Sequence, residues 1–331
     1  MNKILSILLA CTAAGAAYGA QETAQETGQA AKNVAIDSVV VTGARYASDI
    51  RHLPMSVAVV DRDEIVRRQE ASVLPLLTEQ VPGLFVTGRG VMGYGVSDGA
   101  AGGISLRGIG GGSAAQMLVL IDGHPQYMGL FGSNAMGGVI NIVTRRQREE
   151  GVKTDLNVGY GSWNTLQTEA ANRIRKGRFT SIVTGSYNRT DGHRADMGFE
   201  QYGGYAKVGY EISRRWNAYA DVNLTHFNAS NPGEITAPVF DNDSRITRGM
   251  ASVSLENSYD RTSGALKFFY NWGRHRINDG YGAGEEPRDY RFNSKDRMLG
   301  VSWYQSAGLW RGSRLTAGID WQRFGGRAWN R

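Results

Sequence analysis

The second half of the chain alternates apolar and polar residues with a period of two. Residues 216–224 read WNAYADVNL, so that tryptophan, alanine, valine and leucine alternate with asparagine, tyrosine and aspartate. The same alternation returns in ASVSLENSY at 251–259, LKFFYNW at 266–272 and LTAGIDW at 315–321. Because successive side chains of a β-strand point to opposite faces, each segment is predicted to be a strand with one apolar face.

Segments of this kind recur along the second half, and the gaps between them mostly alternate in length. Strands are expected at residues 153–161, 164–175, 178–189, 201–212, 216–227, 246–258, 265–277, 295–307 and 313–324. Short turns are expected at 176–177, 213–215 and 260–264, and long connections at 228–245 and 278–294. Bacterial transmembrane barrels combine strands of roughly 10 residues with short turns on one side and longer loops on the other. An antiparallel transmembrane β-barrel is therefore predicted, with a soluble β-sandwich as the alternative that does not explain the loop asymmetry.

Residues 48–146 lack this regular alternation and carry helical and strand signals in turn. A strand-like run leads into a predicted helix that Asp61 or Asp63 caps. A second predicted helix is broken at Val81-Pro82-Gly83. Short strands bounded by glycines are expected in GGISLRGIG, MLVLIDGHP and GGVINIVTRR. The expectation for this region is a small mixed α/β domain that precedes the barrel.

The N-terminal segment combines a lysine, an apolar run and small residues, which is the layout of a secretory signal peptide. Residues 1–20 are expected to be that signal peptide, and a lipoprotein acceptor at Cys11 is the alternative. Residues 21–47 begin as a polar tail that is too poor in large apolar residues to fold. The tail nevertheless contains a run of β-branched residues at 39–42, which favours a strand. With no evident partner in its own tail, this strand is predicted to pair with another protein.

Composition agrees with an exported β protein and argues against several other classes. The 331 residues include 44 glycines, 15 tyrosines and 7 tryptophans but only 7 prolines. Past the signal peptide, no window offers the roughly 18 apolar residues of a spanning helix. The net charge of +6 is spread along the chain, so no nucleic-acid partner is expected. Cys11 is the only cysteine, which leaves the mature chain without a disulfide framework or a cysteine-based metal site.

The sequence holds no arrangement that predicts catalysis, a cofactor or a metal site. GVSDG around Ser97 matches the nucleophile-elbow string but lacks the strand-turn-helix context that its chemistry needs. GIGGGS falls short of a dinucleotide fingerprint, because Ser113 stands where the third glycine is required. The histidines show no metal-ligand spacing. The chain is therefore not expected to be an enzyme, and no catalytic residue, cofactor or bound metal is predicted.

A series of motifs between residues 36 and 146 follows one recognisable order. The motifs read DSVVVTGARY, LPMSVAVVDRDEI, PLLTEQVPGLFV, GISLRGIG, VLIDGHP and GSNAMGGVINIVTRR. This series resembles the energy-coupling box and plug domain of TonB-dependent outer-membrane receptors, and the predicted barrel agrees with it. The resemblance implies a mixed α/β plug domain at 48–146, followed by an antiparallel transmembrane β-barrel in the bacterial outer membrane.

The resemblance also implies a function and partners. Receptors of this family take up scarce, bulky nutrients and are energised through the inner-membrane TonB complex. The expected ligand is a ferric siderophore or a similar scarce metal chelate, and cobalamin and heme are alternatives within the family. The expected partners are TonB, outer-membrane lipid and the chelate, and the barrel is expected to be monomeric. A passive porin or adhesin barrel is a further alternative, which leaves the valine run and the plug unexplained.

The resemblance assigns roles to particular residues of the tail and plug. In this family the energy-coupling box adds a strand to a sheet edge of TonB through main-chain hydrogen bonds. The matching residues are Ile36, Asp37, Ser38, Val39, Val40, Val41 and Thr42. Arg107 and Asp122 stand beside glycines at strand ends, where charges hold plug strands together or hold the plug against the barrel. An ordinary surface charge at a turn is the alternative for both.

Ligand contact is expected from two glycine-rich plug loops, 88–103 and 124–132. The side chains there that are best able to hold an anionic or aromatic chelate are Arg89, Tyr94, Tyr127 and Phe131. For each of them the alternative is an unpacked loop side chain that contacts no ligand.

The sequence departs from the family pattern at two places. Between Gly132 and Ser133 the family carries a further loop, a strand and an EVLRGP…YG motif, so the plug is expected to be internally shortened near residue 132. About nine strands are predicted, whereas plugged outer-membrane transporters have about 22. Residues 147–331 are therefore expected to be the N-terminal part of the barrel in an incomplete copy, either a fragment or a non-functional truncated remnant.

Overall fold

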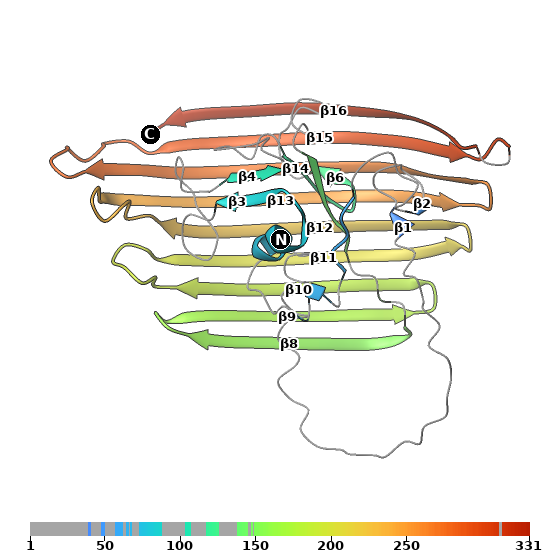
Figure 1. Ribbon diagram of the computed structural model, residues 1–331, viewed down its shortest axis with the longest axis horizontal. Coiled ribbons are helices and arrows are strands. Elements are labelled where there is room, and N and C mark those ends of the chain that lie inside the picture. The colour runs from blue at the N-terminus through green and yellow to red at the C-terminus, as the bar shows by residue number, and fades with distance from the viewer. Residues whose placement is uncertain are drawn as a thin grey trace, which may run out of the picture.

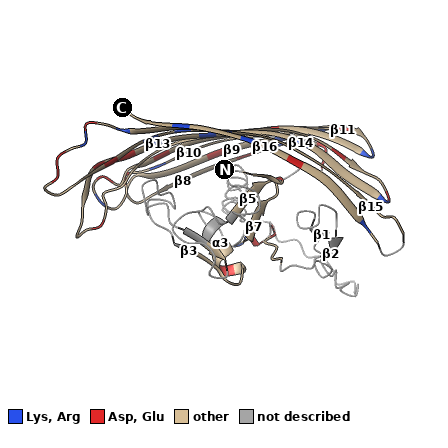
Figure 2. Ribbon diagram, turned by 90° about the horizontal axis from the view of Figure 1, so that it is seen from above, with Lys and Arg blue, Asp and Glu red and all other residues tan. Residues whose placement is uncertain are grey.

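The computed structural model of the protein contains a large β-sheet and a group of short elements on its concave side (Figures 1 and 2). The residues that the structure describes are 39–40, 48–49, 57–61, 64–65, 67, 73–87, 103–106, 117–125, 138–144, 147, 149–310 and 313–331. Among these residues, no helix is long and apolar enough to cross a membrane.

The large sheet has nine strands, each hydrogen-bonded to the next along the chain. The strands are β8 (Gly151–Gly161), β9 (Thr165–Lys176), β10 (Phe179–Thr190), β11 (Phe199–Ser213), β12 (Trp216–Ser230), β13 (Val239–Ser258), β14 (Thr262–Gly282), β15 (Phe292–Ala307) and β16 (Leu315–Asn330). All eight pairings are antiparallel. The antiparallel prediction is therefore confirmed, and the described sheet is open, with β8 and β16 at its edges (Figure 1).

The connections at the two ends of the sheet differ in length. One end, here called the short-turn end, carries the connections 177–178, 214–215 and 259–261, together with the longer connection 308–314. The opposite end, the long-loop end, carries 191–198, 231–238 and 283–291, together with the three-residue connection 162–164.

The predicted long connections at 228–245 and 278–294 are wrong in extent, because β12 to β15 continue far into them. In this part Asp243 pairs with Ser230 on one side and with Asn278 on the other. Backbone pairing thus persists where the regular apolar alternation has ended, so the pattern could not indicate the strand ends.

Burial along the strands is inverted relative to a water-soluble sheet. In β12 the polar Asp221 and Asn223 are 6% and 7% exposed, whereas Val222 and Leu224 between them are 42% and 46% exposed. In the middle of β13, Ser252 and Ser254 face inward and are 4% and 1% exposed, whereas Val253 between them is 54% exposed. A barrel wall in lipid needs this arrangement, with an apolar outer face and a polar interior.

The short elements on the concave side form three small groups. A two-residue ladder joins β1 (Val39–Val40) to β2 (Ser48–Asp49), and β3 (Leu84–Thr87) pairs with β4 (Gly103–Leu106). The helix α3 (Val73–Gln80) precedes β3. The third group is a sheet in which β5 (Met117–Ile121) pairs antiparallel with β6 (His124–Pro125) and parallel with β7 (Gly138–Ile142). These elements are the described part of the predicted mixed α/β plug.

Local sequence accounts for the helix boundaries in the plug. The Asp61 carboxylate accepts a hydrogen bond from the Glu64 backbone N–H at 2.9 Å, as expected of an N-cap residue. The helix α3 ends before the predicted break, where Gly83 adopts a φ of 79° that favours glycine. Leu76 of this helix is 1% exposed and Leu84 of β3 is 6% exposed, so both belong to the small apolar core of the plug.

Candidate functional site

Among the described plug residues, those of the turn between β5 and β6 make polar contacts with the wall. Asp122 and Gly123 form this turn, with φ values of 50° and 80°. An Asp-Gly pair suits a tight hairpin turn that requires positive φ at both positions. The Asp122 carboxylate also accepts hydrogen bonds from the backbone N–H of Thr144, at 3.0 Å, and from its hydroxyl. The turn is thereby fixed to the chain that follows β7.

Two lysines of the wall converge on this turn from strands that are not neighbours. The Lys207 ammonium of β11 lies 2.9 Å from the Asp122 carboxylate and 2.9 Å from the Thr144 hydroxyl. The Lys267 ammonium of β14 donates to the Asp122 backbone carbonyl at 2.9 Å. The side chains of Lys207 and Asp122 are only 8% and 11% exposed, so water screens their attraction weakly.

The aromatic ring of Tyr219 completes the environment of Lys207. The Lys207 ammonium lies 4.2 Å from the centre of this ring, on the neighbouring strand β12. A cation over a ring face gains electrostatic stabilisation that grows as water is excluded. Asp122, Thr144, Lys207 and Lys267 are hereafter called the plug–wall junction.

A second contact lies beside the junction and uses β6. The Asn271 amide of β14 donates a hydrogen bond to the Pro125 carbonyl at 2.6 Å. His124 is 1% exposed, and its ring packs edge-on against Phe269 with 5.7 Å between the ring centres. Three alternate residues of β14 therefore contact the plug: Lys267 through its ammonium, Phe269 through its ring and Asn271 through its amide.

Closer to the long-loop end, the concave face carries a cluster of charged groups. Arg248 of β13 binds Asp296 of β15 through two hydrogen bonds, at 3.2 Å and 3.1 Å. The bridge crosses over Gly273 of β14, where an added Cβ would lie 2.4 Å from the Asp296 carboxylate. His275 stands next to the bridge, with its Nε2 atom 3.9 Å from the same carboxylate. This cluster places hydrogen-bond donors and acceptors on the concave face.

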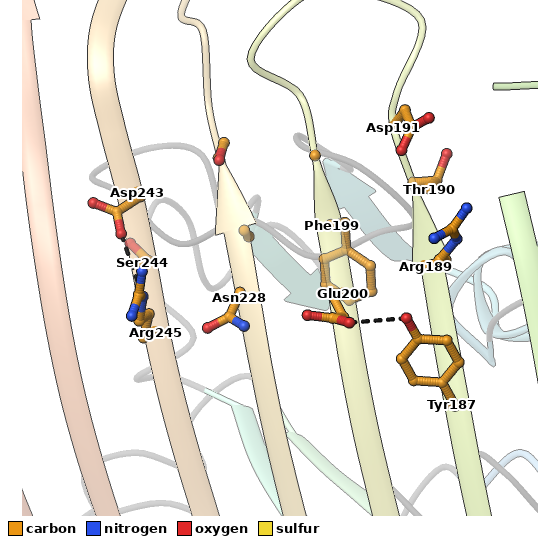
Figure 3. Close-up of a pocket in the computed structure, with 13 residues that line it drawn as sticks. Tyr187, Arg189, Thr190, Asp191, Phe199, Glu200, Asn228, Asp243, Ser244 and Arg245 are labelled. Carbon is orange, nitrogen blue, oxygen red and sulfur yellow. Dashed lines mark hydrogen bonds and ion pairs between the residues drawn. The ribbon is translucent and has the colours of Figure 1, made fainter. Parts of the chain in front are cut away.

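A cavity of about 400 Å³ lies at the long-loop end of β10 to β13 (Figure 3). Its charged lining includes Arg189, Glu200, Asp243 and Arg245. Glu200 accepts a hydrogen bond of 2.8 Å from the Tyr187 hydroxyl, which Figure 3 shows as a dashed line. Along their strands these four charged residues alternate with the inward-facing residues, so their side chains point to the outer face. The cavity therefore belongs to the outer surface of the sheet and is separate from the plug–wall junction.

The structure describes only part of the residues assigned from the sequence. Asp122 lies in the plug–wall junction, and Val39 and Val40 form β1. The prediction that the valine run has no partner in its own chain is therefore wrong, because Val39 and Val40 pair with Ser48–Asp49 of β2. Serine and aspartate do not favour a strand, so the sequence did not indicate this partner. Outside the described residues lie Ile36, Asp37, Ser38, Val41, Thr42, Arg89, Tyr94, Arg107, Tyr127 and Phe131.

Lys207 and Lys267 are functional candidates that the sequence reading did not single out. Each lysine lies on the more polar face of a strand whose residues alternate between polar and apolar. This alternation could have identified both lysines as inward-facing. Their shared target could not have been inferred, because Asp122 precedes them by 85 and 145 positions in the chain.

Comparison with known proteins links this architecture to a family. Residues 49–174 match the TonB-dependent Receptor Plug Domain family. The iron-regulated outer membrane virulence protein of Vibrio cholerae serotype O1 is 30% identical over 148 residues, in a match that covers 34% of this chain and 21% of that protein.

Solved structures share the fold at low sequence identity. The ferripyoverdine receptor of the Pseudomonas aeruginosa outer membrane matches with a TM-score of 0.66 and 11% identity, over 88% of this chain and 45% of the receptor. The alcaligin outer membrane receptor FauA from Bordetella pertussis matches with a TM-score of 0.63 and 17% identity, over 88% of this chain and 50% of that receptor. The chain thus spans half or less of the length of these proteins. The plug match, the outer-membrane relative and the shared fold together support a TonB-dependent outer-membrane receptor, whose plug domain residues 49–174 match.

Proposed function

We propose that this chain is part of a receptor that takes up a ferric siderophore, or a similar scarce metal chelate, with energy from TonB. The plug–wall junction is the observation that carries the proposal. A plug bound to the polar concave face by buried charges closes the path along the wall, so passage requires work on the plug. A passive porin needs no such occluding domain.

The energy input is assigned to the box at Ile36–Thr42. Val39 and Val40 pair with Ser48–Asp49 in a ladder of only two residues, so their backbone groups are suited to strand pairing. Exchange of this short ladder for a longer one on a TonB sheet edge would retain the backbone hydrogen bonds and add further ones. A pull on the box would then act on the plug.

The junction is proposed to set how firmly the plug stays in place. Asp122 supplies the anionic side of the ion pair and Lys207 the cationic side. Arg107 is proposed to serve a similar structural role elsewhere in the plug. Ligand contact is proposed for Arg89, Tyr94, Tyr127 and Phe131, together with the Arg248–Asp296 cluster on the concave face.

An uptake assay in iron-starved cells tests the proposal. The full chain is produced in a TonB-positive strain that lacks its own siderophore receptors, and radiolabelled iron is supplied as ferripyoverdine or ferric alcaligin. The ligands of the related receptors make these chelates the first probes. The expected result is accumulation that requires TonB. Uptake of cobalamin or heme in place of iron would change the proposed substrate to that compound. Accumulation without TonB would contradict the proposal.

A further inference from the structure

The outer face of β14 to β16 carries a concentration of basic residues near the long-loop end. On these strands Asn271 and Met298 point inward and are 4% and 0% exposed, so residues of the opposite parity face outward. Beyond the level of Tyr270 and Leu299, the outward basic residues are Arg274, Arg276, Lys295, Arg297 and Arg327. In the part of these strands that the structure describes, no outward position holds an aspartate or glutamate. This set is hereafter called the outer basic patch.

Three members of the patch lie directly opposite one another. Arg274 of β14 pairs in register with Lys295 of β15, which pairs in turn with Arg327 of β16. Directly opposed side chains of like charge destabilise a sheet. Among the described residues no ion pair to a carboxylate relieves this row. The row is therefore unfavourable for the isolated fold unless an external anion neutralises it.

On the outer face of β10 to β13, basic residues lie beside acidic ones. Across β10 and β11, Arg189 stands opposite Glu200 in register. At the start of β13, Asp243 forms ion pairs with Arg291 at 2.6 Å and with Arg245 at 3.7 Å. The cations named on β10 to β13 thus have an acid beside them, although Arg245 also stands opposite Arg276 of β14. Over β14 to β16 no carboxylate of the described residues forms an ion pair with a member of the patch. An excess of arginine and lysine along the chain as a whole does not explain this contrast.

Aromatic residues place the patch relative to the membrane. Toward the short-turn end the same outward face continues with exposed Tyr270, Leu299 and Trp321, which belong to the apolar band. Trp329 lies among the basic residues, with Lys295 and Arg327 at 5.7 Å and 5.2 Å from its ring. Aromatic girdles mark the boundary between lipid and water in outer-membrane barrels, and their longer loops face the cell exterior. The patch therefore lies at the headgroup level of the outer leaflet.

We propose that the outer basic patch binds a phosphorylated lipid headgroup of the outer leaflet. Guanidinium groups bind phosphate through paired hydrogen bonds, and a row of cations on three adjacent strands suits a headgroup with more than one phosphate. The lipid would replace the missing acidic partners and fix this segment of the wall at its depth in the membrane. The inference rests on the outer-membrane location and is independent of which nutrient is transported.

A lipid-binding measurement on the purified full chain in detergent tests the proposal. The probe is a diphosphorylated lipid A, offered in micelles and compared with zwitterionic phosphatidylcholine. The test variant carries Arg274→Gln, Lys295→Gln and Arg327→Gln together, and the matched control is Arg189→Gln, an outward arginine that faces Glu200. We expect the triple variant to bind lipid A about tenfold more weakly and the control to bind it like the unchanged chain.

Thermal unfolding separates lipid binding from a general loss of fold. Without lipid A, the triple variant should melt at or above the temperature of the unchanged chain, because like charges have been removed. Lipid A should raise the melting temperature of the unchanged chain and of Arg189→Gln but leave the triple variant unmoved. Equal binding by all three proteins would overturn the proposal, as would equal stabilisation by inorganic phosphate, which would indicate a site for free anions.

Discussion

Individual residues carry the interaction between plug and wall. Lys207 and Asp122 form a buried ion pair, and the hydroxyl and backbone of Thr144 satisfy further hydrogen-bonding capacity of the same groups. A buried charge that keeps its partner is tolerated, whereas one that loses its partner is costly. The strength of the junction therefore depends on both members being present.

Replacement of Lys207 by methionine should loosen the plug. The variant leaves the Asp122 carboxylate buried without its ammonium partner, and the expected cost to docking is about 3 kcal/mol. Hydrogen exchange of the β5 and β6 amides measures this loss as faster exchange. Lys176→Met changes a lysine at the exposed end of β9 and serves as the control. Unchanged protection in Lys207→Met would contradict the assigned role of the junction.

Replacement of Val40 by proline should separate energy coupling from ligand binding. Proline removes a backbone donor from the box, so pairing with TonB should fail while the ligand-binding part of the receptor is unchanged. We expect TonB-dependent uptake to be lost and chelate binding to whole cells to persist. Val40→Ile keeps the backbone donor and should transport normally. Normal uptake by the proline variant would remove the basis for the TonB assignment.

At the scale of elements, the strands were predictable and their ends were not. All nine wall strands contain the predicted segments in large part, because a half-apolar strand in lipid shows the two-residue period directly. Pairing of β12 to β15 beyond the apolar band leaves no such period, so the long connections were overestimated. The Asp122 turn was recognisable from its Asp-Gly pair. Its lysine partners were not, since they come from β11 and β14.

Gly273 of β14 allows a side-chain bridge to cross the strand, and alanine there should disturb it. The new Cβ would lie 2.4 Å from the Asp296 carboxylate, so the Arg248–Asp296 bridge would have to shift. The expected loss is about 1–3 kcal/mol in the free energy of unfolding. Denaturant titration in detergent gives this value. Gly185→Ala is the matched control, because no atom lies within 4 Å of a Cβ added there, and equal losses would refute the explanation.

At the scale of the whole molecule, the inverted burial explains why the sheet requires a membrane. Val222 and Leu224 are exposed while Asp221 and Asn223 are buried against the concave side. In water this surface would favour aggregation, and in lipid it is matched to its surroundings. The two faces of each strand could be separated from sequence alone. Assignment of the polar face to the interior required the resemblance or the structure.

A cation on the apolar band should hinder membrane insertion. Val222→Lys places an ammonium on the lipid-facing side of β12, where the expected cost is about 2–4 kcal/mol if the position lies near the bilayer midplane. Folding into lipid vesicles, followed by the shift in gel mobility of the folded form, measures the effect. Ile235→Lys, on an exposed residue of the connection 231–238, should insert normally. Equal insertion of both variants would show that this face does not contact lipid.

The sequence by itself determined the properties that depend on local order along the chain. These are the alternating wall strands, the broken helix before Gly83, the Asp-Gly turn and the motif series of the plug, because each arises from residues close together in sequence. Tertiary structure alone decided which strands meet the plug, how Lys207 and Lys267 reach Asp122, and how Arg274, Lys295 and Arg327 align in one row. Those features depend on strand register and on the curvature of the sheet, which bring together groups that lie far apart along the chain.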